Sequence, residues 1–133
     1  MGLSFKPNTD DMRDAPSIDI AQALLASGAH VRGYDPVAMD AARPLLPEVE
    51  MFPDVYSMAE GCDALMVITE WNEFKNLDLE RIRNLLNQAA ILDGRNIYDP
   101  GKMAALGFQY RGLGRGYDGS KTENEIELHA AVG

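Results

Sequence analysis

The stretch FKPNTDDMRDAPS, residues 5–17, decides the fold through its position between two regular elements. The four residues before it are short of polar side chains and resemble the end of a β-strand, whereas apolar residues after it recur at helical spacing. The stretch itself is polar and contains two prolines, which is typical of a loop. A loop from a strand to a helix in a parallel sheet lies at the carboxyl end of the strand, where open α/β sheets bind ligands.

The rest of the chain alternates between helix and strand patterns. Continuous apolar runs are typical of strands buried on both faces, and Asp before an apolar-periodic segment is typical of a helix N-cap. The predicted helices are residues 15–27 (capped by Asp14), 37–46, 54–60 (capped by Asp54), 78–86 (capped by Asp78) and 99–106 (opened by Asp99-Pro100). The predicted strands are residues 30–35, 49–52, 64–69, 89–92 and 108–113, and residues 70–77 are a predicted loop.

This alternation predicts an α/β fold, a Rossmann-like three-layer sandwich with a mostly parallel sheet. A central strand needs about five or six residues, yet only four precede Phe5. We therefore expect a truncated first strand and a chain that is a piece of a longer protein. Residues 1–116 are expected to form the domain, and residues 117–133, which are polar and contain glycine, a mobile tail.

Composition excludes several classes of protein. No apolar run approaches the ~18 to 20 residues of a membrane span, and the start of the chain lacks a signal-peptide pattern. The net charge of −9, from 21 acidic and 12 basic residues, argues against nucleic acid or an anionic membrane as a partner. The single Cys62 forbids an internal disulfide and fits a reducing, cytoplasmic location.

Parallel strands would bring three loops to one edge of the sheet, residues 5–17, 70–77 and 93–98. Among the residues that these loops hold are the cations Lys6, Arg13 and Arg95 and the aromatic residues Trp71 and Phe74. Arg binds phosphate through paired hydrogen bonds and Lys binds it as a compact charge, so the edge suits a phosphorylated ligand with a flat base. Two alternatives stay open. The cations could serve merely to balance nearby carboxylates such as Asp93, and the aromatic residues could pack on the core.

Other kinds of site find less support. The G-x-G-x-x-G motif of dinucleotide binding is missing between the first strand and the first helix. Asp35 ends a strand where a ribose-binding acid could lie, but without those glycines a structural role is favoured. His30 and His129 are far apart and have no second ligand at metal spacing, so no metal site is expected. Cys62 is expected to be a buried structural thiol, and no catalytic residue is predicted.

Several segments carry a resemblance to a known family. They are GLSFKPNTDDMRDAPS (2–17), YDP (34–36), ITEWNEF (68–74), DGRNIYDP (93–100) and GLGR (112–115). In this order and spacing they resemble the carboxyl-terminal UDP-binding domain of the UDP-glucose 6-dehydrogenases, in the UDP-glucose/GDP-mannose dehydrogenase family. Enzymes that oxidise GDP-mannose or UDP-N-acetylmannosamine share the FK…D…R opening, whereas TEWNEF and DGRNIYDP look more like the UDP-glucose enzyme.

The resemblance implies an enzyme that oxidises UDP-glucose to UDP-glucuronate with two NAD. It implies an NAD domain, a central dimerisation region and this UDP-sugar-binding domain, and hence a homo-oligomer. Phe5, Lys6 and Arg95 correspond to substrate contacts, and Arg13 corresponds to a residue that reaches the NAD held by the other domain. The family's catalytic Cys and glycine-rich NAD loop have no counterpart, so the chain alone is expected to be inactive.

Two alternatives to that function remain open. The chain could be a free-standing nucleotide-sugar-binding module, or the equivalent domain of a GDP-mannose or UDP-N-acetylmannosamine dehydrogenase. We expect the isolated chain to bind UDP-glucose weakly or not at all, because half of the cleft would come from the missing domains.

Overall fold

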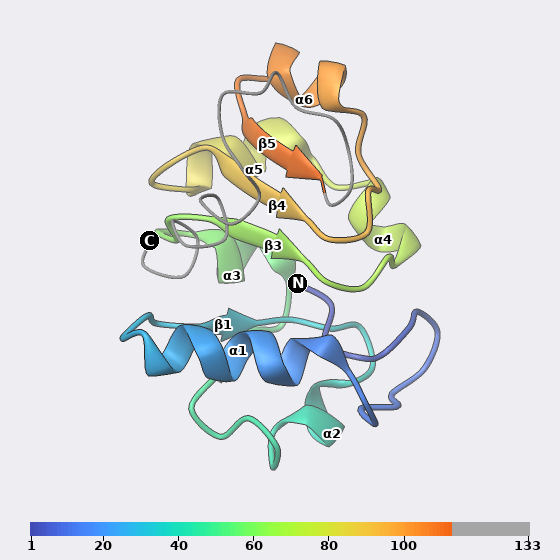
Figure 1. The fold of residues 1–133 in the computed structure, drawn as a ribbon. Coiled ribbons are helices and arrows are strands. Elements are labelled where there is room, and N and C mark those ends of the chain that lie inside the picture. The colour runs from blue at the N-terminus through green and yellow to red at the C-terminus, as the bar shows by residue number, and fades with distance from the viewer. Residues whose placement is uncertain (113–133) are drawn as a thin grey trace.

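Short parallel strands form the central layer of the protein. The computed structural model describes residues 1–112, so the predicted tail (117–133) and the last residues of the predicted domain lie outside the described residues. Strands β1 (Arg32–Gly33) and β2 (Glu50–Met51) pair with each other, and β3 (Leu65–Val67), β4 (Ala90–Asp93) and β5 (Gln109–Gly112) form a second group in the order β3-β4-β5. All these pairings are parallel, as predicted (Figure 1).

The first three residues lie between the two groups of strands (Figure 1). The Met1 amine donates to the Met66 carbonyl, and the Met1 carbonyl accepts from the Ile68 amide at 3.0 Å, which is the pattern of neighbouring parallel strands. On the other side, the Gly2 amide donates to the carbonyl of Tyr34 at 2.8 Å, directly after β1. This segment therefore occupies the position predicted for the shortened first strand and joins the two groups into one layer.

Gly2 makes a close backbone contact with Thr69. Its φ is +84°, and an added Cβ would lie 2.6 Å from the Thr69 Cβ. We expect Gly2→Ala to lower the free energy of unfolding by at least about 2 kcal/mol, because the left-handed backbone and the overlap with a packed neighbour each cost about 1–3 kcal/mol. Urea denaturation measures the loss.

Gly28→Ala is the matched control for this substitution. Gly28 has a similar φ of +88°, but no atom lies within 4 Å of the added Cβ. The loss in free energy of unfolding in Gly28→Ala therefore measures the backbone cost alone. Equal losses in the two variants would show that the contact of Gly2 with Thr69 carries no cost.

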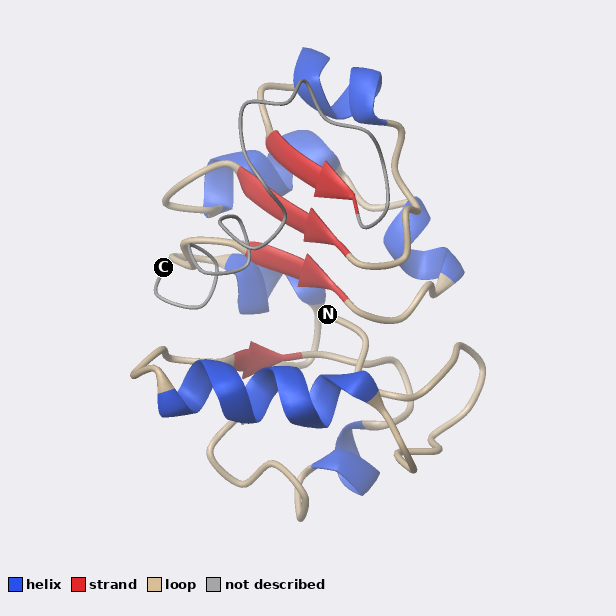
Figure 2. Ribbon diagram, in the orientation of Figure 1, coloured by secondary structure: helices blue, strands red, loops and turns tan. Residues whose placement is uncertain are grey.

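Helices lie on both sides of the strands, as the three-layer prediction requires (Figure 2). In the view of Figure 1, α1 lies in front of β1, and α3 and α5 lie behind β3 and β4. The helices are α1 (Pro16–Ala26), α2 (Met39–Ala42), α3 (Val55–Ala59), α4 (Asn72–Lys75), α5 (Leu79–Leu85) and α6 (Pro100–Ala105). None of the helices within residues 1–112 has the length and apolar character that a membrane span requires.

Aspartates cap three of the helices as the sequence predicts. The side chains of Asp54, Asp78 and Asp99 each accept a hydrogen bond from the amide three residues further on. The prediction for Asp14 was wrong. Ala15 is the N-cap of α1 and makes no side-chain cap bond, while Asp14 adopts a left-handed conformation with a φ of 56°. The proline at the start of α1 lacks an N–H, so one of the unpaired N–H groups at the start of a helix is absent here.

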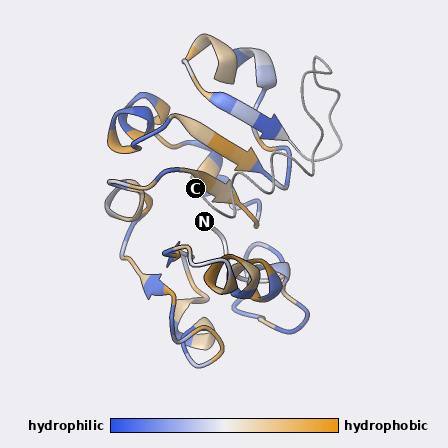
Figure 3. Ribbon diagram, turned by 60° about the vertical axis from the view of Figure 1, so that its left-hand side comes forward, coloured by the Kyte–Doolittle hydropathy of each residue, from blue (hydrophilic) through white to orange (hydrophobic). Residues whose placement is uncertain are grey.

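The main hydrophobic core lies between the β3-β4-β5 group and the helices around it. Its most buried members include Val55, Met58, Leu65, Val67, Phe74, Ile82, Ile91 and Met103. Figure 3 shows hydrophobic residues along β4 and more hydrophilic residues along β5, as expected of a central and an edge strand. Two smaller clusters lie around α1. This packing fixes the strand ends from which the site loops start.

The segment that follows β3 differs from its prediction as a plain loop. It contains the four-residue helix α4, and its two aromatic residues turn inward: Trp71 is 9% exposed and Phe74 is fully buried. The Tyr98 hydroxyl donates to the Phe74 carbonyl and so holds α4 against the core. Of the two roles left open for these aromatic residues, packing on the core is the one that the structure supports.

Candidate functional site

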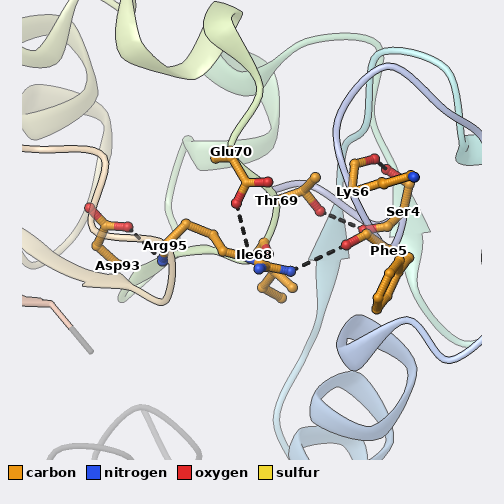
Figure 4. Close-up of polar contacts among 8 residues, drawn as sticks. All are labelled: Ser4, Phe5, Lys6, Ile68, Thr69, Glu70, Asp93 and Arg95. Atoms are coloured by element: carbon orange, nitrogen blue, oxygen red, sulfur yellow. Dashed lines mark hydrogen bonds and ion pairs between the residues drawn. The ribbon is translucent and has the colours of Figure 1, made fainter. Parts of the chain in front are cut away.

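Arg95 connects all three loops at the carboxyl edge of the strands (Figure 4). It follows β4, and its Nε donates to the Ile68 carbonyl at the end of β3 at 2.7 Å. Its Nη2 donates to the Phe5 carbonyl in the first loop at 3.2 Å. Residues that lie 90 positions apart in the sequence therefore contact each other, and the juxtaposition of the first loop with Arg95 is a property of the fold.

The acidic partner of Arg95 is Glu70. Its Oε2 lies 3.3 Å from the Arg95 Nε, and both side chains are about one-third exposed. The alternative that Asp93 balances this cation was wrong: one oxygen of Asp93 accepts from the Arg95 amide, and the other accepts from the Tyr98 amide and the Tyr110 hydroxyl. Sequence reasoning missed Glu70, and the only available signal was its place directly after a buried strand at the same edge.

Lys6 and Phe5 lie on the loop that Arg95 reaches (Figure 4). Both are exposed, and the Phe5 ring is an apolar surface on this loop. Two side-chain hydrogen bonds hold the start of this loop in place. The Ser4 hydroxyl donates to the Lys6 carbonyl at 2.8 Å, and the Thr69 hydroxyl donates to the Ser4 carbonyl at 2.7 Å. Within residues 1–112, no hydrogen bond or ion pair involves the Lys6 ammonium, so it can receive an anion.

Arg13 lies at the far end of the same loop and is paired with Asp11. Its Nε and Nη2 donate to the two carboxylate oxygens of Asp11, each at 3.0 Å. These hydrogen bonds lower the pKa of Asp11 to about 2. For Arg13, the structure therefore agrees with the alternative that the cation balances a nearby carboxylate, since Asp11 lies in the same loop. The Arg13 side chain is 89% exposed.

The Asp35 side chain connects the backbone segment before the first loop to the segment after β1. This carboxylate is fully buried and accepts from the Leu3, Ser4, Val37 and Ala38 amides at 2.8–3.1 Å and from the Trp71 indole at 3.2 Å. Burial alone would raise the pKa of Asp35, but the backbone hydrogen bonds outweigh burial and lower it. The structural role predicted for Asp35 is confirmed, because all of these partners belong to the chain's own scaffold.

The remaining candidates do not join this edge. The Cys62 thiol is half-buried and donates to the Met58 carbonyl at 3.1 Å, and burial raises its pKa, so it is a weak nucleophile. Within residues 1–112, no three His, Cys, Asp or Glu side chains are grouped so that they could hold a metal. A pocket of about 400 Å³ lies between α1 and β3, and its lining includes neither Lys6 nor Arg95.

Parallel strands between helix layers, with cations at the carboxyl edge, define a Rossmann-like domain that can receive an anionic ligand. Residues 1–100 match the UDP-glucose/GDP-mannose dehydrogenase family, UDP binding domain. The chain belongs to this family, and the resemblance seen in the sequence is confirmed.

Curated relatives agree with this assignment. The chain is 48% identical over 115 residues to the UDP-glucose 6-dehydrogenase of Rhizobium meliloti (strain 1021), and 45% identical over 116 residues to the UDP-glucose 6-dehydrogenase TuaD of Bacillus subtilis (strain 168). Each alignment covers 86% of this chain but only 26% and 25% of the respective relative. The chain therefore spans about a quarter of the length of these relatives.

Solved structures show the same fold. A UDP-glucose dehydrogenase from Pyrobaculum islandicum matches with a TM-score of 0.68 and 32% identity, over 84% of this chain and 23% of that one. An NDP-N-acetyl-D-galactosaminuronic acid dehydrogenase from Methanosarcina mazei Go1 matches with a TM-score of 0.74 and 28% identity, over 86% and 23%. These matches confirm the predicted Rossmann-like fold.

Proposed function

We propose that this chain binds UDP-glucose as one domain of an NAD-dependent UDP-glucose 6-dehydrogenase. The observation that carries the proposal is the contact of Arg95 with the Phe5 carbonyl, which places the Arg95 guanidinium beside the loop that holds Lys6. Two cations on one edge suit the diphosphate of a nucleotide sugar, because charge-assisted hydrogen bonds to phosphate are strong. The exposed Phe5 ring offers an apolar surface to the rest of the ligand.

The chain's own residues do not fit a complete NAD site. The segment that enters α1 contains no glycine between Phe5 and Ser17, whereas a dinucleotide pyrophosphate needs a glycine-rich turn there. NAD, the hydride acceptor, is therefore proposed to bind to a part of the enzyme outside this chain, with the exposed Arg13 reaching toward it. The catalytic Cys is proposed to lie outside this chain too. The complete enzyme is proposed to be a cytoplasmic homo-oligomer.

Loss of either cation is expected to weaken substrate binding in the full-length enzyme. Lys6→Ala or Arg95→Ala should cost roughly 1.5–3 kcal/mol, the value of one hydrogen bond to a charged group. That cost corresponds to about a 10- to 150-fold rise in the dissociation constant. Calorimetry with UDP-glucose measures it.

Arg43→Ala is the control for these variants. Arg43 is an exposed arginine that pairs with Asp40 outside the three loops, so its loss should leave affinity unchanged. Unchanged affinity in both the Lys6 and the Arg95 variants would refute the proposal. Micromolar binding of UDP-glucose by the 133-residue chain alone would instead favour a free-standing binding module, and tighter binding of another nucleotide sugar would favour one of the sister dehydrogenases.

A further inference from the structure

The ion pair between Glu70 and Arg95 lies at the edge where the proposed ligand binds. Glu70 directly follows the fully buried Thr69, so its backbone is held at the end of β3. Its side chain is 34% exposed and that of Arg95 is 32% exposed, so the pair faces solvent rather than the core. Figure 4 shows the Glu70 carboxylate and the Phe5 carbonyl on different sides of the Arg95 guanidinium.

Arg95 does not depend on Glu70 for its orientation. Two backbone carbonyls hold the guanidinium, that of Ile68 at 2.7 Å and that of Phe5 at 3.2 Å. Carbonyl groups have no net charge, so they fix the position of the guanidinium and leave its positive charge uncompensated. Within residues 1–112, Glu70 is the only carboxylate in an ion pair with Arg95. Orientation and charge compensation are therefore supplied by different groups.

We propose that Glu70 lowers the affinity of this edge for the anionic part of the ligand by neutralising Arg95. The inference rests on the proposed function, since it assumes that a phosphate approaches the Arg95 guanidinium. A phosphate there meets the Glu70 carboxylate, which lies 3.3 Å from the Arg95 Nε, and like charges at such distances repel. The effect acts on the charged diphosphate of the ligand and leaves an uncharged nucleoside unaffected. Glu70 thus sets how tightly a nucleoside diphosphate is held and how readily it leaves.

Glu70→Gln is the variant that tests this role, because it removes the charge and keeps the size of the side chain. The probes are UDP and uridine, each titrated into the full-length enzyme and followed by calorimetry. We expect the dissociation constant for UDP to fall about three- to fivefold, from the usual strength of an exposed ion pair, while that for uridine stays the same. The gain should shrink as salt is added.

Two further variants separate this effect from others. Glu80→Gln removes the same charge from an exposed position on α5 and should leave UDP binding unchanged. In an Arg95→Ala background, Glu70→Gln should tighten UDP binding less than it does when Arg95 is present, because the cation that Glu70 compensates is gone and only its direct repulsion of the phosphate remains.

Three results would overturn the inference. One is equal or weaker UDP binding by the Glu70 variant, and another is an equal change for uridine and UDP, which would mean that Glu70 acts on the shape of the loop. The third is an equal tightening of UDP binding by Glu70→Gln with and without Arg95, since Glu70 would then not act through that cation. The proposed function itself is tested separately, by substrate binding of the Lys6 and Arg95 variants of the full-length enzyme.

Discussion

In an Asp35→Ala variant, we expect the free energy of unfolding to fall by about 4 kcal/mol or more. The substitution removes the acceptor of three buried backbone amides, those of Leu3, Ser4 and Ala38, and of the partly buried amide of Val37. Each buried donor left without a partner costs about 1–3 kcal/mol. Because domains of this size are stable by only about 5–15 kcal/mol, the variant should lose a large part of its stability.

Urea denaturation followed by circular dichroism measures this loss. The Trp71 fluorescence is unsuitable as the probe, because its indole donates to Asp35 and the substitution perturbs it directly. Asp78→Ala is the control, since Asp78 also accepts from a backbone amide but does so at the exposed start of α5. A lost helix cap costs about 0.5–2 kcal/mol. Similar losses in the two variants would show that the Asp35 network contributes no more than a surface cap.

In a polypeptide that begins at Met1, stability is expected to fall as the pH is lowered from 8 to 5. Burial lowers the pKa of the Met1 amine from 8.0 to about 5, even though the Asp35 carboxylate opposes the shift. Between these values the unfolded chain binds a proton that the folded chain does not. The folded state is therefore most stable above pH 8 and loses stability down to about pH 5, by about 1.4 kcal/mol per unit and about 4 kcal/mol in all.

Acetylation of the Met1 amine gives the matched control. The acetylated nitrogen keeps an N–H that can donate to the Met66 carbonyl, but it cannot gain a proton. The difference between the two proteins in free energy of unfolding, measured from pH 5 to 8.5, isolates the contribution of the amine. Parallel pH profiles would contradict a buried, neutral amine at this position.

Local sequence signals predicted much of the fold because local interactions decide those features. The caps at Asp54, Asp78 and Asp99 depend only on an amide three residues away, and all three were found. The first helix was located within one residue at each end, since its apolar spacing and its glycine stop lie within the segment itself. Such features need no knowledge of the rest of the chain.

Features that depend on distant contacts were not predictable in the same way. Helix α4 has only four residues, too few to be stable alone, and the buried Phe74 and the hydrogen bond from Tyr98 hold it in place. The joining of the two strand groups into one layer depends on backbone hydrogen bonds of Met1 and Gly2 to distant residues, which no local pattern records.

The candidate site also combines a feature that the sequence could predict with one that it could not. Parallel topology was enough to bring Lys6 and Arg95 to one edge in prediction, because strand direction alone decides which loops meet. The identity of the acid beside Arg95 was not predictable, since Asp93 is two residues away in sequence and Glu70 is much further. The backbone turns Asp93 toward amides and a tyrosine hydroxyl, and only the folded chain brings Glu70 within 3.3 Å of the Arg95 Nε.

The three-residue segment that links the two groups of strands has a consequence for ligand binding. The first loop, with Lys6, continues into α1 beside β1, whereas Arg95 extends from β4 in the other group. A bound diphosphate that engages both cations would span the seam between these halves. A bound ligand would then add contacts across this seam, so that the domain becomes harder to pull apart mechanically when its ligand is present.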